Sequence, residues 1–216
     1  MATNSWPRRA KPAPAAGEEI VDRKKRKRRL PKVVRKPEWS RLLDATTSQR
    51  DRALIALMLY GGLRVSEACA LRVRDVDFEG EQVHILHGKG DKEAYVYVHS
   101  DALDEVRTLL TERGKPAPGD PVFRSKKGGA LSRAQAWRIV KAVGEATGIG
   151  AFENDAGDAD NWLSPHKMRH SCATRMLERG ANLRVVQDHM RHASIATTEI
   201  YTHIANPELK RAAQDM

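Results

Sequence analysis

The segment 49–60 constrains the fold most, because its apolar side chains lie on almost every side of a helical projection rather than on one stripe. An apolar run such as Ala53 to Tyr60 is typical of a helix buried in the middle of a domain. Gly61 and Gly62 follow directly and end the helix. The run is far shorter than the roughly 20 residues that a bilayer-spanning helix needs. The sequence therefore predicts a domain built around one central helix.

Amphipathic patterns and capping residues predict further helices around this one. They are expected from Pro37 to about Asp44, from Arg64 to about Leu71, from Ser100 to about Arg113, after Ser132 to about Thr147, after Ser164 to Arg179, from Asn182 to about Met190, and in short segments from Ser194 and Pro207. Segments 75–80, 82–86 and 94–99 predict strands, and the acidic stretch 148–163 predicts a solvated loop. The fold class is therefore α+β and mostly α, with one small antiparallel sheet.

Positive charge is concentrated at the start of the chain. Residues 1–36 contain 13 of the 38 Lys and Arg but only 3 of the 28 acidic residues, so they carry the whole formal excess of +10. Residues 1–30 are expected to form a disordered basic tail, and residues 31–216 one domain. The tail contains consecutive basic residues that suit a polyanion such as DNA: Arg23, Lys24, Lys25, Arg26, Lys27, Arg28 and Arg29. A solubilising tail or a nuclear localisation signal is the alternative.

The cysteines and the N-terminal composition bear on where the protein works. Cys69 and Cys172 each lie in an apolar helical pattern, so we expect packed thiols rather than a disulfide. The first residues include Pro and Arg but no apolar core, unlike a signal peptide. We therefore expect a cytoplasmic protein that has no membrane partner.

Five segments carry the residue types that phosphoryl transfer on DNA requires. They are 61–67 with Arg64, 88–93 with Lys89, 164–170 with His166, Arg169 and His170, 191–194 with His192, and 197–203 with Tyr201. The reaction needs a nucleophile that loses a proton, cations that neutralise the non-bridging oxygens, and a proton donor for the leaving oxygen. A phenol, two guanidiniums, two imidazoles and an amine can supply these without ATP. We therefore expect no cofactor and no metal.

In their order and spacing these segments resemble the tyrosine recombinase (phage integrase) family, and most closely its Xer-like bacterial members. The resemblance extends from about Leu30 to about Pro207, and His192 lies nine residues before Tyr201. It implies a site-specific recombinase or integrase that breaks and rejoins double-stranded DNA through a 3′-phosphotyrosyl intermediate. It also implies a homo-tetramer on DNA, accessory DNA-bending proteins as further partners, and a nucleoid-associated location.

The resemblance assigns Tyr201 as the nucleophile. A free phenol has a pKa of ~10, so it needs a base and cations nearby. His166 would accept the Tyr201 proton. Lys89, on the turn between two expected strands, would protonate the leaving 5′-oxygen, with Lys92 as the alternative.

Two arginines would bind the scissile phosphate in this scheme. Arg64 and Arg169 suit the task because a guanidinium donates two parallel hydrogen bonds and keeps its charge. His192 would donate a further hydrogen bond to the phosphate. Glu67 resembles the family's acidic residue that orients the site, with a helix surface charge as the alternative. His170 would support the site from behind.

Two histidine pairs also have a spacing found in zinc sites. His166 and His170 are four residues apart, and His189 and His192 are three apart. No Glu follows His166 as a zincin would require, and no Cys is suitably spaced. The metal interpretation is therefore the weaker one.

The sequence departs from the family in two places. The family usually has Leu-Gly-His where this chain has Met190-Arg191-His192, so Arg191 would take a left-handed cap position at a cost of roughly 1 kcal/mol, or would contact a DNA phosphate. Family members also commonly carry a helical DNA-clamping domain before the catalytic one, and the basic tail is expected to replace part of its grip. A type IB topoisomerase-like enzyme and a DNA-binding regulator with weakened catalysis are the alternative functions.

Overall fold

The computed structural model describes residues 33–86, 93–153, 159–161 and 163–191 of the chain. They belong to one unit, Pro31–Met216. Its helices are α1 (Lys36–Asp44), α2 (Gln49–Tyr60), α3 (Val65–Ala70), the 3-10 turn η1 (Val73–Asp75), α4 (Ser100–Glu112), α5 (Arg133–Thr147), α6 (Pro165–Glu178) and α7 (Leu183–His189). The strands are β1 (Val76–Asp77), β2 (Gln82–Ile85), β3 (Ala94–Tyr97), β4 (Ala151–Glu153) and β5 (Ala159–Asn161). The predicted α+β class with a helical majority is confirmed.

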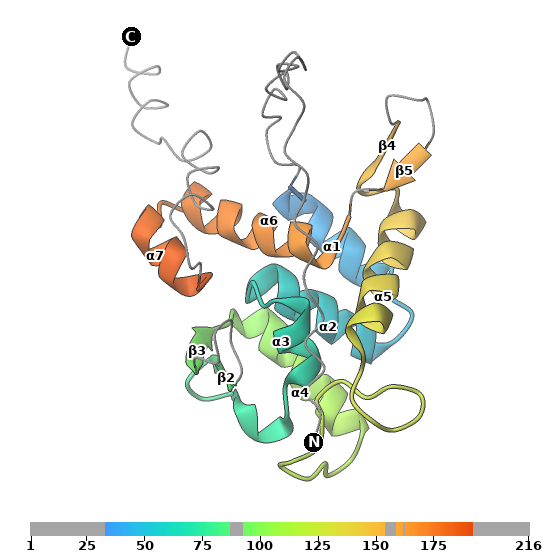
Figure 1. Ribbon diagram of the computed structural model, residues 1–216, viewed down its shortest axis with the longest axis vertical. Coiled ribbons are helices and arrows are strands. Elements are labelled where there is room, and N and C mark those ends of the chain that lie inside the picture. Colours follow the sequence, from blue (N-terminus) through green and yellow to red (C-terminus); the bar gives the residue numbers. More distant parts are fainter. Residues whose placement is uncertain (1–32, 87–92, 154–158, 162, 192–216) are drawn as a thin grey trace, which may run out of the picture. The chain divides into compact units, whose positions relative to one another are not determined.

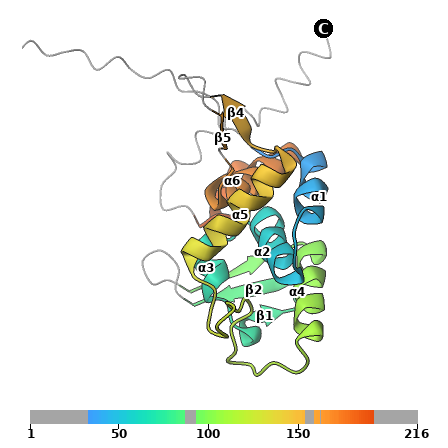
Figure 2. The same ribbon diagram turned by 90° about the vertical axis from the view of Figure 1, so that its right-hand side faces the viewer.

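Helix α2 is the centre of this unit, as its apolar pattern predicts (Figures 1 and 2). Every residue from Ala53 to Leu59 is completely buried. The helix packs against α4, α6 and α1, with further contacts to α3 and α5. Burying each large aliphatic side chain contributes about 1.5–3 kcal/mol, so the packing of α2 contributes strongly to the stability of the elements that hold the site.

Local capping explains where the neighbouring helices begin. The hydroxyl of Ser48 accepts a hydrogen bond from the Asp51 amide at the start of α2, and Ser164 caps α6 in the same way through the Lys167 amide. The predicted capping box of α5, Ser132 with Gln135, is present. The prediction for α4 is wrong by one residue: His99 is the N-cap, because its ring Nδ1 accepts from the Asp101 amide, and Ser100 lies inside the helix.

Strands β1, β2 and β3 form an antiparallel sheet in that order. Val83 pairs with Val96, and both are buried on the face that packs into the core. His84 and Tyr95, the next pair, lie on the opposite face. The predicted first strand, 75–80, is longer than the observed one, because Asp75 belongs to the 3-10 turn η1 and residues 78–80 form a turn.

The acidic stretch 148–163 was expected to be a loop, and this prediction is wrong. Strands β4 and β5 pair antiparallel, with Phe152 opposite Asp160. The left-handed Gly148 (φ 67°) ends α5 before the first strand begins. The predicted turn that carries Lys89 and the helices expected from Ser194 and Pro207 lie outside the described residues.

Both cysteines are buried free thiols, as predicted. Burial raises the pKa of Cys69 to about 11 and that of Cys172 to about 12. Both therefore carry their proton at neutral pH. In the described part of the chain, none of the helices is long and apolar enough to cross a bilayer.

Candidate functional site

Arg64 lies where the chain leaves α2 and enters α3. Gly62 adopts a left-handed conformation (φ 62°), which turns the chain so that Arg64 becomes the N-cap of α3. The Arg64 Nη1 donates to Glu67 Oε1 over 2.7 Å, and Nη2 donates to the carbonyl of Arg191 over 2.8 Å. Its side chain is 26% exposed, so this guanidinium is fixed by two partners and still reaches solvent.

Arg169 approaches the same place from the first turns of α6. Arg169 is 5% exposed. Its two terminal nitrogens donate to the carbonyls of Gly62 and Met190. Burial, together with Arg64 and Arg191, lowers the pKa of Arg169 to about 10. The group is therefore still a cation at neutral pH.

Glu67 is the anion that holds this cluster together. It is 4% exposed, and its carboxylate accepts from Arg64 Nη1, the Arg64 amide (2.7 Å) and Arg191 Nη2 (2.5 Å). Arg169 Nη1 lies 4.0 Å from Oε2. Burial alone would raise the pKa of Glu67, but Arg191 and Arg64 outweigh it and the pKa is lowered. The surface-charge interpretation of Glu67 is therefore wrong.

Arg191 takes the left-handed position predicted for it, with a φ of 50°. Its side chain is 14% exposed and forms an ion pair with Glu67. This contact takes the place of the alternative one, with a DNA phosphate. Arg191 Nη1 also donates to the carbonyl of His189 over 3.2 Å. The sequence predicted the strained backbone but not this ion pair, because the contact joins α3 to the turn after α7 and has no local pattern.

His166 and His170 form a pair on α6 next to the arginines. Their Nε2 atoms are 2.7 Å apart and their rings meet edge to face. Burial, followed by Lys167, Arg169 and Arg64, lowers the pKa of His166. The imidazole is consequently neutral at pH 7 and can accept a proton. His170 is buried beneath it.

His189 is a further residue of this region that sequence reasoning treated only as a metal ligand. Its Nε2 lies 3.2 Å from the carbonyl of Gly61, and burial followed by Arg191 lowers its pKa. It thus links the end of α7 to the end of α2. Among the described residues there is no group of three or more His, Cys, Asp or Glu side chains arranged to hold a metal ion.

Several predicted site residues lie outside the described residues. These are Tyr201, His192, Lys89, its alternative Lys92, and the basic run from Arg23 to Arg29. The structure therefore brings together Arg64, Glu67, His166, Arg169 and His170, and adds Arg191 to them.

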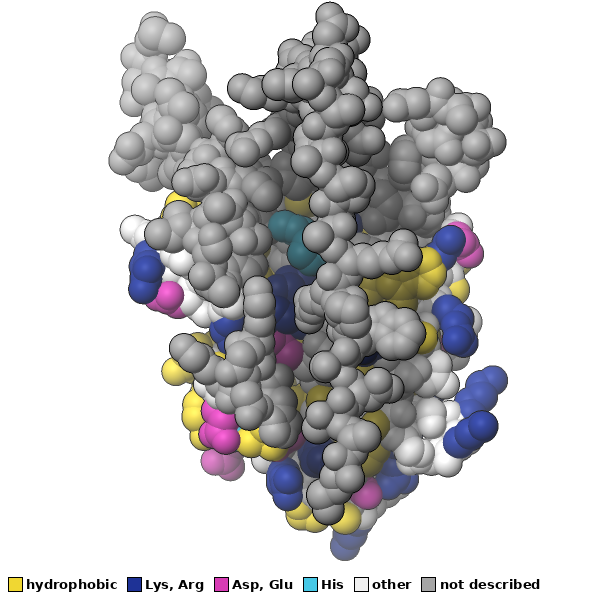
Figure 3. Space-filling model, in the orientation of Figure 1, with side chains coloured by type: hydrophobic (Ala, Val, Ile, Leu, Met, Phe, Trp, Pro, Cys, Tyr) yellow, Lys and Arg dark blue, Asp and Glu magenta, His cyan; other side chains and the backbone are white. Residues whose placement is uncertain are grey.

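Three guanidiniums around one carboxylate leave an excess of two positive charges. Figure 3 shows histidine, basic and acidic side chains side by side near the middle of one face. Each guanidinium has five N–H donors, so Arg64 and Arg169 retain donors beyond the bonds described above. An arrangement of this kind binds an oxyanion and stabilises additional negative charge on it.

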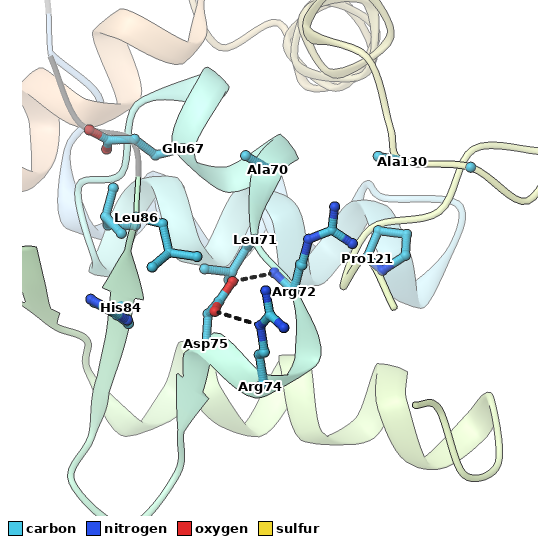
Figure 4. A pocket seen from close by; sticks show the side chains of 12 residues that line it. Glu67, Ala70, Leu71, Arg72, Arg74, Asp75, His84, Leu86, Pro121 and Ala130 are labelled. Atoms are coloured by element: carbon cyan, nitrogen blue, oxygen red, sulfur yellow. Dashed lines mark hydrogen bonds and ion pairs between the residues drawn. The ribbon is translucent and has the colours of Figure 1, made fainter. Parts of the chain in front are cut away.

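A cavity of about 490 Å³ extends from Glu67 towards the sheet (Figure 4). Arg72 and Arg74 lie next to each other at its far end, and the Asp75 carboxylate faces both of them. The Asp75 carboxylate accepts from the Arg72 amide over 2.9 Å and lies 3.8 Å from Arg74 Nε. Asp75 thus offsets part of their charge.

The sequence matches the phage integrase family over residues 32–208. The tyrosine recombinase XerC of Actinobacillus pleuropneumoniae serotype 7 (strain AP76) is 36% identical over 218 residues, which cover 94% of this chain and 67% of the relative. The tyrosine recombinase XerA of Pyrococcus furiosus is 38% identical over 189 residues, covering 86% of this chain and 62% of the relative. The chain thus spans about two thirds of the length of these relatives.

Solved structures of recombinases have the same fold. The crystal structure of XerA recombinase superposes with a TM-score of 0.72 at 28% identity, covering 87% of this chain and 65% of that one. XerH site-specific recombinase bound to its difH substrate, in a pre-cleavage complex, gives a TM-score of 0.66 at 30% identity, with coverages of 85% and 54%.

Proposed function

Because this chain belongs to the phage integrase family, we propose that it is a site-specific tyrosine recombinase that cleaves and rejoins double-stranded DNA. The observation that carries the proposal is the meeting of Arg64 and Arg169 at Glu67, with the neutral His166 beside them. This is an oxyanion site with a base next to it. The named relatives are recombinases, which favours recombination over the topoisomerase-like alternative.

In the proposed reaction Tyr201 is the nucleophile. Its oxygen attacks the scissile phosphorus while His166 takes the phenolic proton. A 3′-phosphotyrosyl bond forms, the P–O5′ bond breaks, and the leaving 5′-oxygen takes a proton from Lys89. The 5′-hydroxyl of a partner strand then attacks the phosphotyrosyl bond and releases Tyr201, so no external energy source is consumed.

The arginines stabilise the charge that develops in this reaction. A phosphodiester carries one negative charge, and attack by a phenolate adds a second. Arg64 and Arg169 donate hydrogen bonds to the non-bridging oxygens, aided by His192. Preorganised donors of this kind lower the barrier because they are already oriented before the reaction begins. Glu67 and His170 hold the donors and the base in place.

The remaining assignments complete the proposal. We assign residues 31–216 to the catalytic domain and residues 1–30 to a basic tail whose Arg23–Arg29 run binds DNA phosphates. XerH was solved on DNA, which supports a DNA partner for this chain. A tetramer on two duplexes, accessory DNA-bending proteins, and a cytoplasmic, nucleoid-associated location follow from the same proposal.

Capture of a covalent complex tests the proposed chemistry. The protein is incubated with a library of nicked duplexes whose central sequence is randomised, so that cleavage releases a short strand and traps the enzyme on DNA. We expect a denaturant-resistant protein–DNA complex that is lost in Tyr201→Phe. Tyr97→Phe, a change at a tyrosine that is 69% exposed on β3, is the matched control and should retain the complex. Absence of any covalent complex across the library would favour a DNA-binding regulator.

A further inference from the structure

Arg191 contacts two residues of the anion site, Arg64 and Glu67, and directly follows the residue whose carbonyl binds Arg169. Its carbonyl accepts from Arg64, and the carbonyl of the preceding Met190 accepts from Arg169. Its own guanidinium donates a hydrogen bond to Glu67, which also accepts one from Arg64. One turn of the chain therefore supplies two carbonyl acceptors and one cation to the same cluster.

This turn is strained at Arg191. A φ of 50° is the left-handed region, which favours glycine because an L side chain brings its Cβ close to the backbone carbonyl. A residue held there must be stabilised by its surroundings. The ion pair with Glu67 provides that stabilisation: its nitrogen and oxygen are 2.5 Å apart, and the Glu67 side chain is only 2% exposed. A glycine would adopt the backbone geometry easily but could not bind Glu67.

We propose that Arg191 is a positioning residue: through Glu67 it fixes the Met190–Arg191 turn in the geometry that orients Arg64 and Arg169. The third guanidinium also raises the positive charge of the site by one. The inference rests on the proposed function only for its effect on catalysis, because the contact with Glu67 is independent of the reaction.

The geometry explains why an arginine is required rather than any cation. Nη2 binds Glu67 while Nη1 binds the carbonyl of His189, so the planar fork joins α3 to the end of α7. A lysine has a single ammonium group and cannot span both acceptors with fixed geometry. Arg191→Lys should therefore restore charge without restoring the position of the turn.

The test combines Arg191→Gly with two controls. Arg191→Gly removes the guanidinium and relieves the strain. Glu81→Gly relieves strain at another residue with a positive φ (49°) far from the cluster along the chain. Arg184→Ala removes an arginine from helix α7, which precedes the Met190–Arg191 turn, at a position where the side chain is 72% exposed. Hydrogen exchange of the segment 183–191 and the rate of covalent complex formation are measured for each protein.

We expect exchange in 183–191 to be about tenfold faster in Arg191→Gly, because the turn opens locally when the ion pair is lost. Covalent complex formation should be at least about tenfold slower, with DNA affinity changed less than about twofold, and Arg191→Lys should recover only part of the rate. Both controls should behave as the wild type.

Two outcomes would overturn the proposal. One is exchange in Arg191→Gly equal to that of the wild type, and the other is covalent complex formation at the wild-type rate. If the wild type itself forms no covalent complex, the proposed recombinase function fails. The exchange measurement then decides alone whether Arg191 fixes the turn.

Discussion

The Nε2 atoms of His166 and His170 lie 2.7 Å apart on consecutive turns of α6. At this distance one nitrogen must carry the hydrogen and the other must accept it, so both rings cannot be protonated at Nε2 without repulsion. The pair therefore works as a unit in which the tautomer of each ring depends on that of the other. Burial and the adjacent cations keep His166 neutral by lowering its pKa.

This pair predicts how the cleavage rate depends on pH. A His166 that accepts the proton of Tyr201 must be neutral, and its lowered pKa lies below the ordinary value of 6.5. The acid side of the profile of covalent complex formation against pH should thus have its midpoint below the 6.5 of an ordinary histidine, with the full rate retained at neutral pH. A pH–rate profile checks this, with His166→Gln as the comparison. If the rate of His166→Gln falls over the same acidic pH range as that of the wild type, another group is the base.

Glu67→Gln should destabilise the protein at neutral pH. The substitution leaves three buried or half-buried guanidiniums without their shared carboxylate, and losing one partner of a buried ion pair costs about 3 kcal/mol. The folded-state pKa of Glu67 is lowered, so its stabilisation is present above the ordinary value of 4.5 and is lost as the pH falls through the folded-state pKa. Urea denaturation at several pH values should show the two proteins converging in acid.

A matched exposed pair separates this effect from general loss of charge. Asp188 lies 3.3 Å from Arg184 on α7, and its side chain is 64% exposed. Asp188→Asn should change the free energy of unfolding by less than about 1 kcal/mol, because exposed ion pairs contribute little. A loss in Asp188→Asn as large as that in Glu67→Gln would contradict the central role of Glu67.

The sequence predicted the helices well because their signals are local. The all-round apolar pattern of 49–60 and the Ser132 capping box lie within single elements, and both match the structure. The pairing of β4 with β5 was missed because an acidic composition argues for a solvated loop, whereas backbone hydrogen bonding between the two segments, which composition does not reveal, decides the structure there. The contact between Glu67 and Arg191 was missed for a similar reason: it joins residues 124 positions apart.

Gly62→Ala should impair both folding and the site. Gly62 has a φ of 62°, and an added Cβ would lie 2.6 Å from Cε of Met190. The conformational strain costs about 1 kcal/mol, and the buried Met190 side chain would have to move, in the residue whose carbonyl binds Arg169. Gly180→Ala is the matched control, because it has the same kind of backbone (φ 88°) with nothing near its Cβ. The midpoint temperature of thermal unfolding should fall further for Gly62→Ala than for Gly180→Ala. Only Gly62→Ala should lose cleavage activity.

Arg64→Lys and Arg169→Lys should have different consequences. Arg64 is the more exposed of the two, so its replacement should leave the fold intact and slow covalent complex formation by about 100-fold through loss of oriented donors. Arg169 is almost fully buried and binds two carbonyls, so Arg169→Lys should also lower the midpoint of thermal unfolding. Equal losses of stability in both variants would show that Arg169 is no more important for the fold than Arg64.

The basic tail gives a prediction that needs no catalysis. If the run Arg23–Arg29 binds DNA phosphates, each contact contributes about 0.9 to the slope of log affinity against log salt. A variant of the same length with serine at all of these positions should show a shallower slope and weaker binding to duplexes of any sequence. Because phosphate contacts carry no sequence information, preference among target sites should be unchanged. Fluorescence anisotropy over a salt series measures both properties, and an unchanged slope would remove the tail from the DNA-binding surface.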